Sequence, residues 1–223
     1  MCGLLFLSDM LERRTLATVA VAVALVTAGC GLITGEEALE FDASPATVTD
    51  QAQSDTGYEE TNVSERVVTR EFTVAGQTRE VRVTNHLAQY EREVDLGPLG
   101  SQRAGVFVTF ASPEVEVAGQ TFNPIADMSE RELLEQFDSE YQNIQVGGRV
   151  ENRTATVLGQ STSVEKFEGT ADLGGSQVDV YIHVTKVKHE GDFVVALSIY
   201  PQRLDGEEER VMSLLEGTEH SGE

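Results

Sequence analysis

The feature that most restricts the fold of this chain is a series of segments in which apolar and polar residues alternate. In residues 177–188, QVDVYIHVTKVK, apolar residues occupy positions 178, 180, 182 and 184, and this spacing of two is the period of a β-strand. Residues 67–85 contain two β-rich runs around Ala75-Gly76-Gln77, a pattern typical of a β-hairpin. Residues 105–110 and 193–200 are almost continuously apolar, as in central strands that are covered on both faces. The sequence therefore predicts a fold built mainly on a sheet.

Three segments carry start and stop signals of helices. A serine followed by proline opens residues 44–57, and a glycine closes them. Ser129 and Glu132 form a capping box ahead of an apolar stripe with helical spacing. A third helix is predicted over residues 205–217. Together the patterns predict an α+β fold, with a mostly antiparallel twisted sheet packed with about three helices.

The charge balance of the chain is strongly acidic. Asp and Glu number 38 against 16 Lys and Arg, which gives a formal net charge of -22, although 40% of the residues are hydrophobic. Such a charge repels nucleic acids, which excludes that class of partner. Near 1 M salt the Debye length shrinks to about 3 Å, which removes the cost of repulsion between surface carboxylates. We therefore expect a protein of a salt-rich environment that loses structure as salt falls below roughly 1 M.

The N-terminal residues have the order of an export signal. Arg13 and Arg14 precede an uncharged stretch over residues 16–28, LATVAVAVALVTA, which ends in small residues. As a helix this stretch is about 20 Å long, shorter than the roughly 30 Å hydrocarbon core of a bilayer. The paired arginines resemble the twin-arginine signal that exports folded proteins. Residues 1–9 do not fit this pattern, so we expect translation to start at Met10.

Cys30 is predicted to be a lipid attachment site. Residues 27–30, TAGC, resemble the lipoprotein box, in which small residues precede a cysteine that becomes the lipid-bearing first residue of the mature chain. The only other cysteine, Cys2, lies before the expected start, so neither a disulfide nor a thiolate zinc site is expected.

These signals divide the chain into four parts. Residues 1–29 are the export signal, and residues 30–37 are a lipid-anchored N-terminus with a short tether. Residues 38–217 form a single α+β domain, and residues 218–223 are a polar tail. The expected location is the outer face of the cell membrane, with the lipid bilayer as a partner through Cys30 and the domain as a monomer.

Motifs for enzymatic chemistry are scarce in this sequence. There is no Gly-x-Ser-x-Gly nucleophile motif, and the four histidines lack His-Glu-x-x-His spacing. We therefore expect no metal and no cofactor. Asp179, Tyr181 and His183 share one face of a predicted strand and are candidates for a ligand-binding face, although alternation alone also places polar residues there. Asn62 and Asn152 begin N-glycosylation sequons, which have a meaning only if the chain is exported.

Several segments resemble a known family. ALEFDASPATV, VDLGPLG, VEVAGQTFNP, DVYIHVTKV and YPQRLDGEEE are similar to a family of haloarchaeal lipoproteins of unknown function. More distantly, the order of elements from Ser129 to Gly217 is similar to the PsbP/Mog1-like α/β sandwich proteins, a likeness of topology only. The first resemblance implies a lipid-anchored protein of a halophilic archaeon and names no activity.

Two classes of function remain open. The favoured one is a non-enzymatic domain that binds a protein or a small molecule at the outer face of the membrane. The alternative is a cell-surface hydrolase or transferase whose site is assembled from dispersed Asp, Glu and His residues.

Overall fold

The computed structural model describes residues 38–74, 77–95, 101–117, 119–141, 144–173 and 176–221. The described residues divide into two compact units. The smaller unit holds residues 38–39 and the described part of 69–82, where Thr73 and Thr78 join their hydroxyl groups by a hydrogen bond of 2.9 Å. The larger unit holds residues 40–68 and the described part of 83–223.

One eight-stranded sheet dominates the fold. Its path runs β1-β4-β5-β11-β10-β9-β8, and β3 pairs with β4 off this path. From β4 to β8 along this path, neighbouring strands are antiparallel. The strands are β1 (Leu39–Asp42), β3 (Glu59–Val74), β4 (Gln77–Asp95), β5 (Ser101–Pro113), β8 (Ile144–Val157), β9 (Gln160–Leu173), β10 (Ser176–His189) and β11 (Asp192–Pro201).

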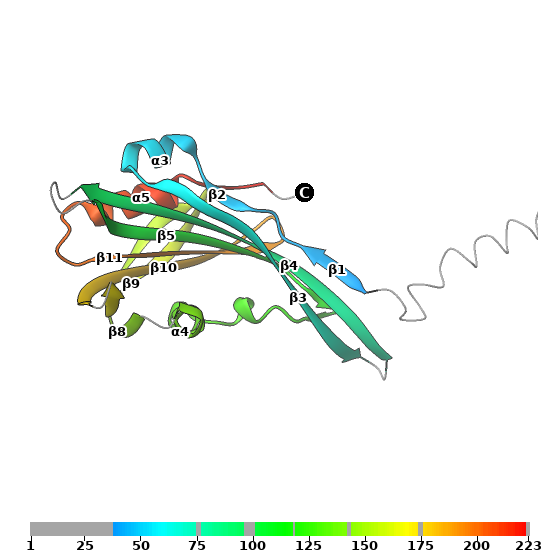
Figure 1. The fold of residues 1–223 in the computed structure, drawn as a ribbon. Helices are drawn as coiled ribbons and strands as arrows, with labels where there is room; N and C mark the ends of the chain where they lie inside the picture. The colour runs from blue at the N-terminus through cyan, green and yellow to red at the C-terminus, as the bar shows by residue number, and fades with distance from the viewer. Residues whose placement is uncertain are drawn as a thin grey trace, which may run out of the picture. The chain divides into compact units, whose positions relative to one another are not determined.

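Helices cover both faces of this sheet. Helices α3 (Asp50–Thr56) and α5 (Glu207–Glu216) lie on one face, and α4 (Glu130–Tyr141) lies on the other (Figure 1). A 3-10 turn, η2 (Pro124–Ala126), precedes α4. The structure thus confirms the α+β fold, with a mostly antiparallel twisted sheet and, in the part of the chain that it describes, three α-helices. Among the described residues, no helix has both the length and the apolar composition that crossing a membrane requires.

The two apolar segments expected to be central strands lie side by side in the middle of the sheet. Residues 105–110 belong to β5 and residues 193–200 to β11, and the two strands pair directly. Strand β11 contributes to both buried clusters, one on each face of the sheet, while β5 contributes to one of them and packs Phe110 against the other. Because each face is covered, alternate residues of these strands need not be polar, which explains their continuous apolar runs.

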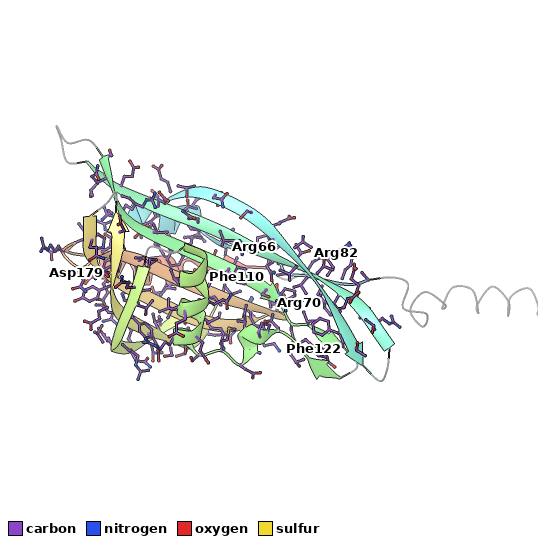
Figure 2. All side chains as sticks on the ribbon, turned by 60° about the horizontal axis from the view of Figure 1, so that its bottom comes forward. Arg66, Arg70, Arg82, Phe110, Phe122 and Asp179 are labelled. Carbon is purple, nitrogen blue, oxygen red and sulfur yellow. The ribbon has the colours of Figure 1, made fainter. Side chains whose placement is uncertain are left out.

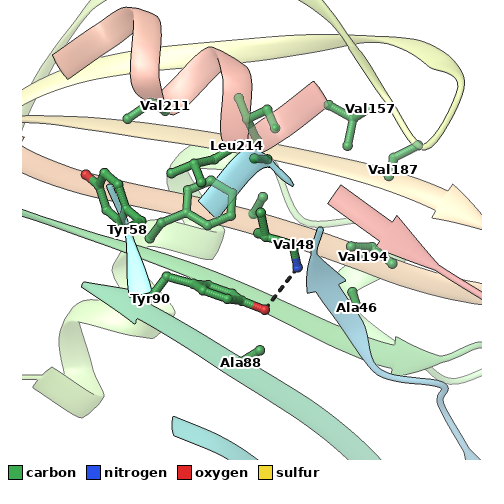
Figure 3. Packing of buried hydrophobic residues seen from close by; sticks show 14 of the residues in the cluster. Ala46, Val48, Tyr58, Ala88, Tyr90, Val157, Val187, Val194, Val211 and Leu214 are labelled. Carbon is green, nitrogen blue, oxygen red and sulfur yellow. Dashed lines mark hydrogen bonds between the residues drawn. The ribbon is translucent and has the colours of Figure 1, made fainter. Parts of the chain in front are cut away.

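The first predicted helix begins later than the sequence indicates. Residues 46–48 form strand β2 (Ala46–Val48), and α3 starts only after Thr49, whose Oγ1 accepts a hydrogen bond of 3.3 Å from the amide of Ala52. The amide of Val48 donates instead to the hydroxyl of Tyr90 at 2.9 Å (Figure 3). Contacts with residues far away in the sequence therefore hold residues 46–48 in a strand, and the helix does not begin at the Ser-Pro signal. The predicted stop is confirmed, since Gly57 ends α3 with φ of 73°.

The last residues of the domain also differ from the expectation of a polar tail. Residues Thr218–His220 form strand β12, which pairs antiparallel with β2. The side chain of His220 is fully buried. The backbone groups of this segment form hydrogen bonds with β2. The polar composition of the segment does not indicate this pairing. The remaining short ladder joins β6 (Glu116–Val117) to β7 (Gln120–Thr121).

The cluster beneath α3 and α5 is the larger of the two cores. Figure 3 shows its packing, in which Tyr58, Tyr90, Val211 and Leu214 are buried together. Burial raises the pKa of Tyr90 to about 12, because the charged phenolate loses its hydration there. The hydroxyl group of Tyr90 is therefore neutral at ordinary pH and accepts the hydrogen bond that fixes β2.

Candidate functional site

A cavity of about 210 Å³ lies between α4 and the sheet face that this helix covers. Its lining is mostly apolar, because alternation along the strands sends every second side chain to this face. The apolar lining residues include Val108, Leu134, Phe137, Val146, Ile182 and Ile199. An apolar cavity with few polar groups is the usual form of a small-molecule site.

The cavity exists because small residues stand where larger side chains would fill it. Ala104 and Ala171 are part of the lining. Beside it, Gly169 has no room for a side chain, since a Cβ atom would lie 2.7 Å from the carbonyl oxygen of Gln145 and 3.1 Å from Cδ1 of Ile182. The spacing of the neighbouring strands therefore depends on glycine at this position.

Two contacts fix α4 over the cavity. Phe110 of β5 lies beside α4, with its ring centroid 6.0 Å from that of Phe137 in an edge-on arrangement (Figure 2). Ahead of the helix, the ammonium group of Lys186 donates to three backbone carbonyls within residues 125–128, at 2.7 to 3.0 Å. The capping box is confirmed as well, because the amide of Ser129 donates to Glu132 at 2.8 Å and the amide of Glu132 donates back to the serine hydroxyl at 3.3 Å.

A small polar group borders the cavity. Gln89 and Arg103 line it, and both contact Glu91: Gln89 Nε2 donates to a carboxylate oxygen at 2.8 Å, and Arg103 Nε lies 3.2 Å from the other. Asp172 also lines the cavity. The described lining contains no Ser, Thr, Cys, His or Lys side chain. Its chemistry therefore suits an apolar ligand that carries a polar end.

The predicted ligand face is divided by the structure. Tyr181 is partly buried and packs against the cluster beneath α3 and α5, while His183 is 1% exposed. Asp179 is exposed at the margin of the sheet, apart from Phe110 (Figure 2), and lines neither the α4 cavity nor the small void beside His183. The three residues do share one strand face, but the histidine is covered and the aspartate is not.

His183 stacks on Tyr200 and bonds to it. The two rings lie 5.6 Å apart at 17°, and Nε2 of the histidine is 3.0 Å from the tyrosine hydroxyl. Burial lowers the pKa of His183 to about 4, since the imidazolium ion would lose its hydration. Burial likewise raises the pKa of Tyr200. Both rings are thus neutral at pH 7, and the pair acts as a polar contact inside the core.

Charged groups surround this pair. Glu208 of α5 accepts a hydrogen bond of 2.6 Å from Lys166, and Arg153 Nη1 lies 3.0 Å from its other oxygen. Burial opposes ionisation of Glu208, but the Lys166 and Arg153 charges outweigh it and lower the pKa of this carboxyl. The ammonium of Lys166 also lies 4.1 Å from the ring centroid of Tyr181. These contacts fix α5 to β8, β9 and β10.

A buried ion pair at the start of α5 is not evident in the sequence. The carboxylate of Glu207, 0% exposed, accepts two hydrogen bonds from the guanidinium of Arg92 and one of 2.8 Å from the hydroxyl of Tyr58. Gly105 makes room for this group, since a Cβ there would lie 2.1 Å from the Tyr58 oxygen. The sequence shows three successive glutamates, typical of a helix start, and no signal separates Glu207 from its neighbours.

The remaining predicted sites concern export and modification. Asn62 on β3 and Asn152 on β8 both have exposed side chains. Ser163 donates to the amide oxygen of Asn152 at 2.8 Å. Cys30, Arg13 and Arg14 lie outside the described residues.

Fold and cavity together define an antiparallel α+β domain with helices on both sheet faces and an apolar cavity beneath one of them. The chain belongs to the family described as Domain of unknown function (DUF6517), whose model matches residues 45–219. No curated protein matches the chain. The match covers the helices, the central strands and the cavity lining, so these features belong to the family domain.

Proposed function

We propose that this domain binds a small, mainly apolar molecule in the cavity between α4 and the sheet. The observation that carries the proposal is the cavity of about 210 Å³, with apolar walls and a border of Gln89, Arg103 and Asp172. Binding releases water from apolar surface, which is favourable without any reactive side chain. The proposed role is thus that of a non-enzymatic binding module.

The size of the cavity limits the ligand. A dry protein cavity of about 150 Å³ accepts benzene, so this cavity matches a single ring or an apolar group of similar bulk. The donors of Arg103 favour a hydroxyl, carboxylate or other acceptor at the polar end of the ligand. We infer a ligand with one compact apolar part and one acceptor group.

A fluorinated ring compound tests this proposal. 4-Fluorobenzyl alcohol is titrated with the protein at high salt, and binding is followed by ¹⁹F NMR. Saturable binding is expected for the native protein, and Val146→Phe should weaken it at least tenfold because the larger ring fills the cavity. Val150→Phe is the matched control on the same strand, since Val150 is 49% exposed and is not a lining residue. Absence of saturable binding, or equal binding by Val146→Phe, would refute the cavity as a ligand site.

We further propose that the domain is held at the outer face of a membrane by a lipid on Cys30, as a lipoprotein of a halophilic archaeon exported by the twin-arginine route. Support comes from the sequence, where paired arginines, an uncharged stretch and TAGC follow one another. Two hydrocarbon chains would anchor the protein stably, because each buried methylene contributes about 0.8 kcal/mol.

Intact mass measurement tests this location. The detergent-extracted protein, expressed in a halophilic host, should begin at Cys30 and carry the mass of a lipid. A Cys30→Ser variant should lose both the lipid and the membrane association. A native protein that retains Met10 and carries no lipid would contradict the proposal, and this result would leave the cavity test unaffected.

A further inference from the structure

A second cluster of side chains lies where the turn between β10 and β11 meets the C-terminal strand. His189 ends β10, Glu190 follows in the turn, and His220 ends β12. Ring nitrogens Nδ1 of the two histidines are 3.1 Å apart, and the rings meet edge-on with centroids separated by 5.3 Å. The two histidines are 31 residues apart in the sequence, so their approach is produced by the pairing of β12 with β2.

The arrangement offers three ligand atoms to one ion. One nitrogen from each histidine and a carboxylate oxygen of Glu190 all lie within 4.8 Å of one another. Two imidazole nitrogens bound to a tetrahedral Zn²⁺ at about 2.0–2.1 Å are roughly 3.3 Å apart, close to the separation seen here. Only small shifts of the rings would therefore be needed to place an ion between them.

Asp192 orients one of the histidines for this task. Its Oδ2 lies 3.0 Å from Nε2 of His220 and accepts a second hydrogen bond, of 2.8 Å, from the amide of Ser44. An acceptor at Nε2 assigns the proton of neutral His220 to that nitrogen, which leaves the lone pair of Nδ1 directed at the cluster. A carboxylate that holds the far nitrogen of a ligand histidine is a regular part of metal sites.

We propose that His189, Glu190 and His220 bind a divalent transition metal ion, with Zn²⁺ as the best match. Two imidazoles and one carboxylate suit zinc and its neighbours rather than Mg²⁺ or Ca²⁺, which prefer all-oxygen sets. Three protein ligands leave a coordination position for water or for an acceptor group. Since Glu190 is exposed, that position faces solvent. The ion would also tie the C-terminal strand to the β10–β11 turn.

Titration of the full chain with zinc tests the site. Protein without a histidine tag is stripped with a chelator and titrated with ZnCl₂ by calorimetry, and with CoCl₂ to record the visible spectrum of the bound ion. One ion per chain is expected. His189→Gln should weaken zinc binding at least 100-fold, and Asp192→Asn, which changes only the orienting group, should weaken it about 10- to 100-fold.

The control is His86→Gln, which removes a histidine outside the cluster and should bind zinc like the native protein. Circular dichroism of each variant at the same salt concentration establishes that it is folded. Thermal denaturation gives a second readout, since zinc should raise the Tm of the native protein but not that of folded His189→Gln. If the native protein binds no zinc, or if His189→Gln binds it equally well, the histidines are joined by a simple Nδ1–H···Nδ1 hydrogen bond and the proposal is wrong.

Discussion

At the scale of single residues, His183 makes stability depend on pH. Its pKa is about 4 in the folded protein against an ordinary value of 6.5. Between these values the unfolded chain binds a proton that the folded chain does not, so acid favours unfolding. The free energy of unfolding should therefore fall by up to about 3 kcal/mol from this residue as pH drops from 6.5 to 4, and this loss should be absent above pH 6.5.

Urea denaturation at constant high salt measures this effect. His183→Gln cannot titrate but keeps a polar side chain facing Tyr200, so its stability should fall less steeply with acid than that of the native protein. His86→Gln should keep the native slope. Because Glu208, Lys166, Arg153 and Glu151 also act on His183, the difference between native protein and variant is the informative quantity. Parallel pH profiles for native protein and His183→Gln would show that the buried histidine does not cause the dependence.

At the scale of elements, the docking of α5 on the sheet depends on Glu207. This carboxylate is fully buried and accepts hydrogen bonds from Arg92, whose side chain is only 13% exposed. The hydrogen bonds that Arg92 donates to Glu207 raise the pKa of Arg92, so removal of the carboxylate leaves a buried charge that cannot be neutralised. Glu207→Ala should lower the free energy of unfolding by about 3–5 kcal/mol, as measured by urea denaturation.

The neighbouring glutamate provides the comparison for this prediction. Glu209 lies two residues after Glu207 and is exposed, so Glu209→Ala should change the free energy of unfolding by less than about 0.5 kcal/mol. Equal stabilities of the two variants would mean that the buried pair contributes nothing net to the docking of α5.

Elements with a local cause could be predicted from the sequence. The capping box before α4, the pairing of the two strands that flank residues 75–77 and the two apolar central strands each depend on residues close together in the chain, and the structure confirms them. Strands β2 and β12 could not be predicted, because each is held by the other and the two lie at opposite ends of the domain's sequence. The PsbP/Mog1-like topology stays a prediction.

The candidate sites were harder to predict for the same reason. Alternation correctly placed Tyr181 and His183 on one strand face, but it carries no information on whether a helix covers that face. The His189–His220 pair and the α4 cavity arise from elements that meet only in the folded domain. His189 and His220 do not have the spacing of a known metal-binding motif, so the sequence alone predicts no metal site at this pair.

At the scale of the whole molecule, the net charge of -22 makes stability depend on salt. All three lysines of the sequence are engaged: Lys166 with Glu208, Lys188 with Glu114, and Lys186 with backbone carbonyls. The 16 basic residues cannot offset 38 acidic ones, so screening must come from dissolved ions. Far-UV circular dichroism should show the fold in several molar KCl and its loss below roughly 1 M.

Charge removal separates screening from other effects of salt. Glu59, Glu65 and Glu209 are exposed, and their joint replacement by glutamine makes the net charge less negative without changing the core. The salt concentration at the midpoint of unfolding should then decrease, because less repulsion has to be screened. Sucrose at equal osmolality should not replace the salt, since it screens no charge. An unchanged spectrum of the native protein in dilute buffer would show that its core alone outweighs the repulsion and that the acidic surface imposes no salt requirement.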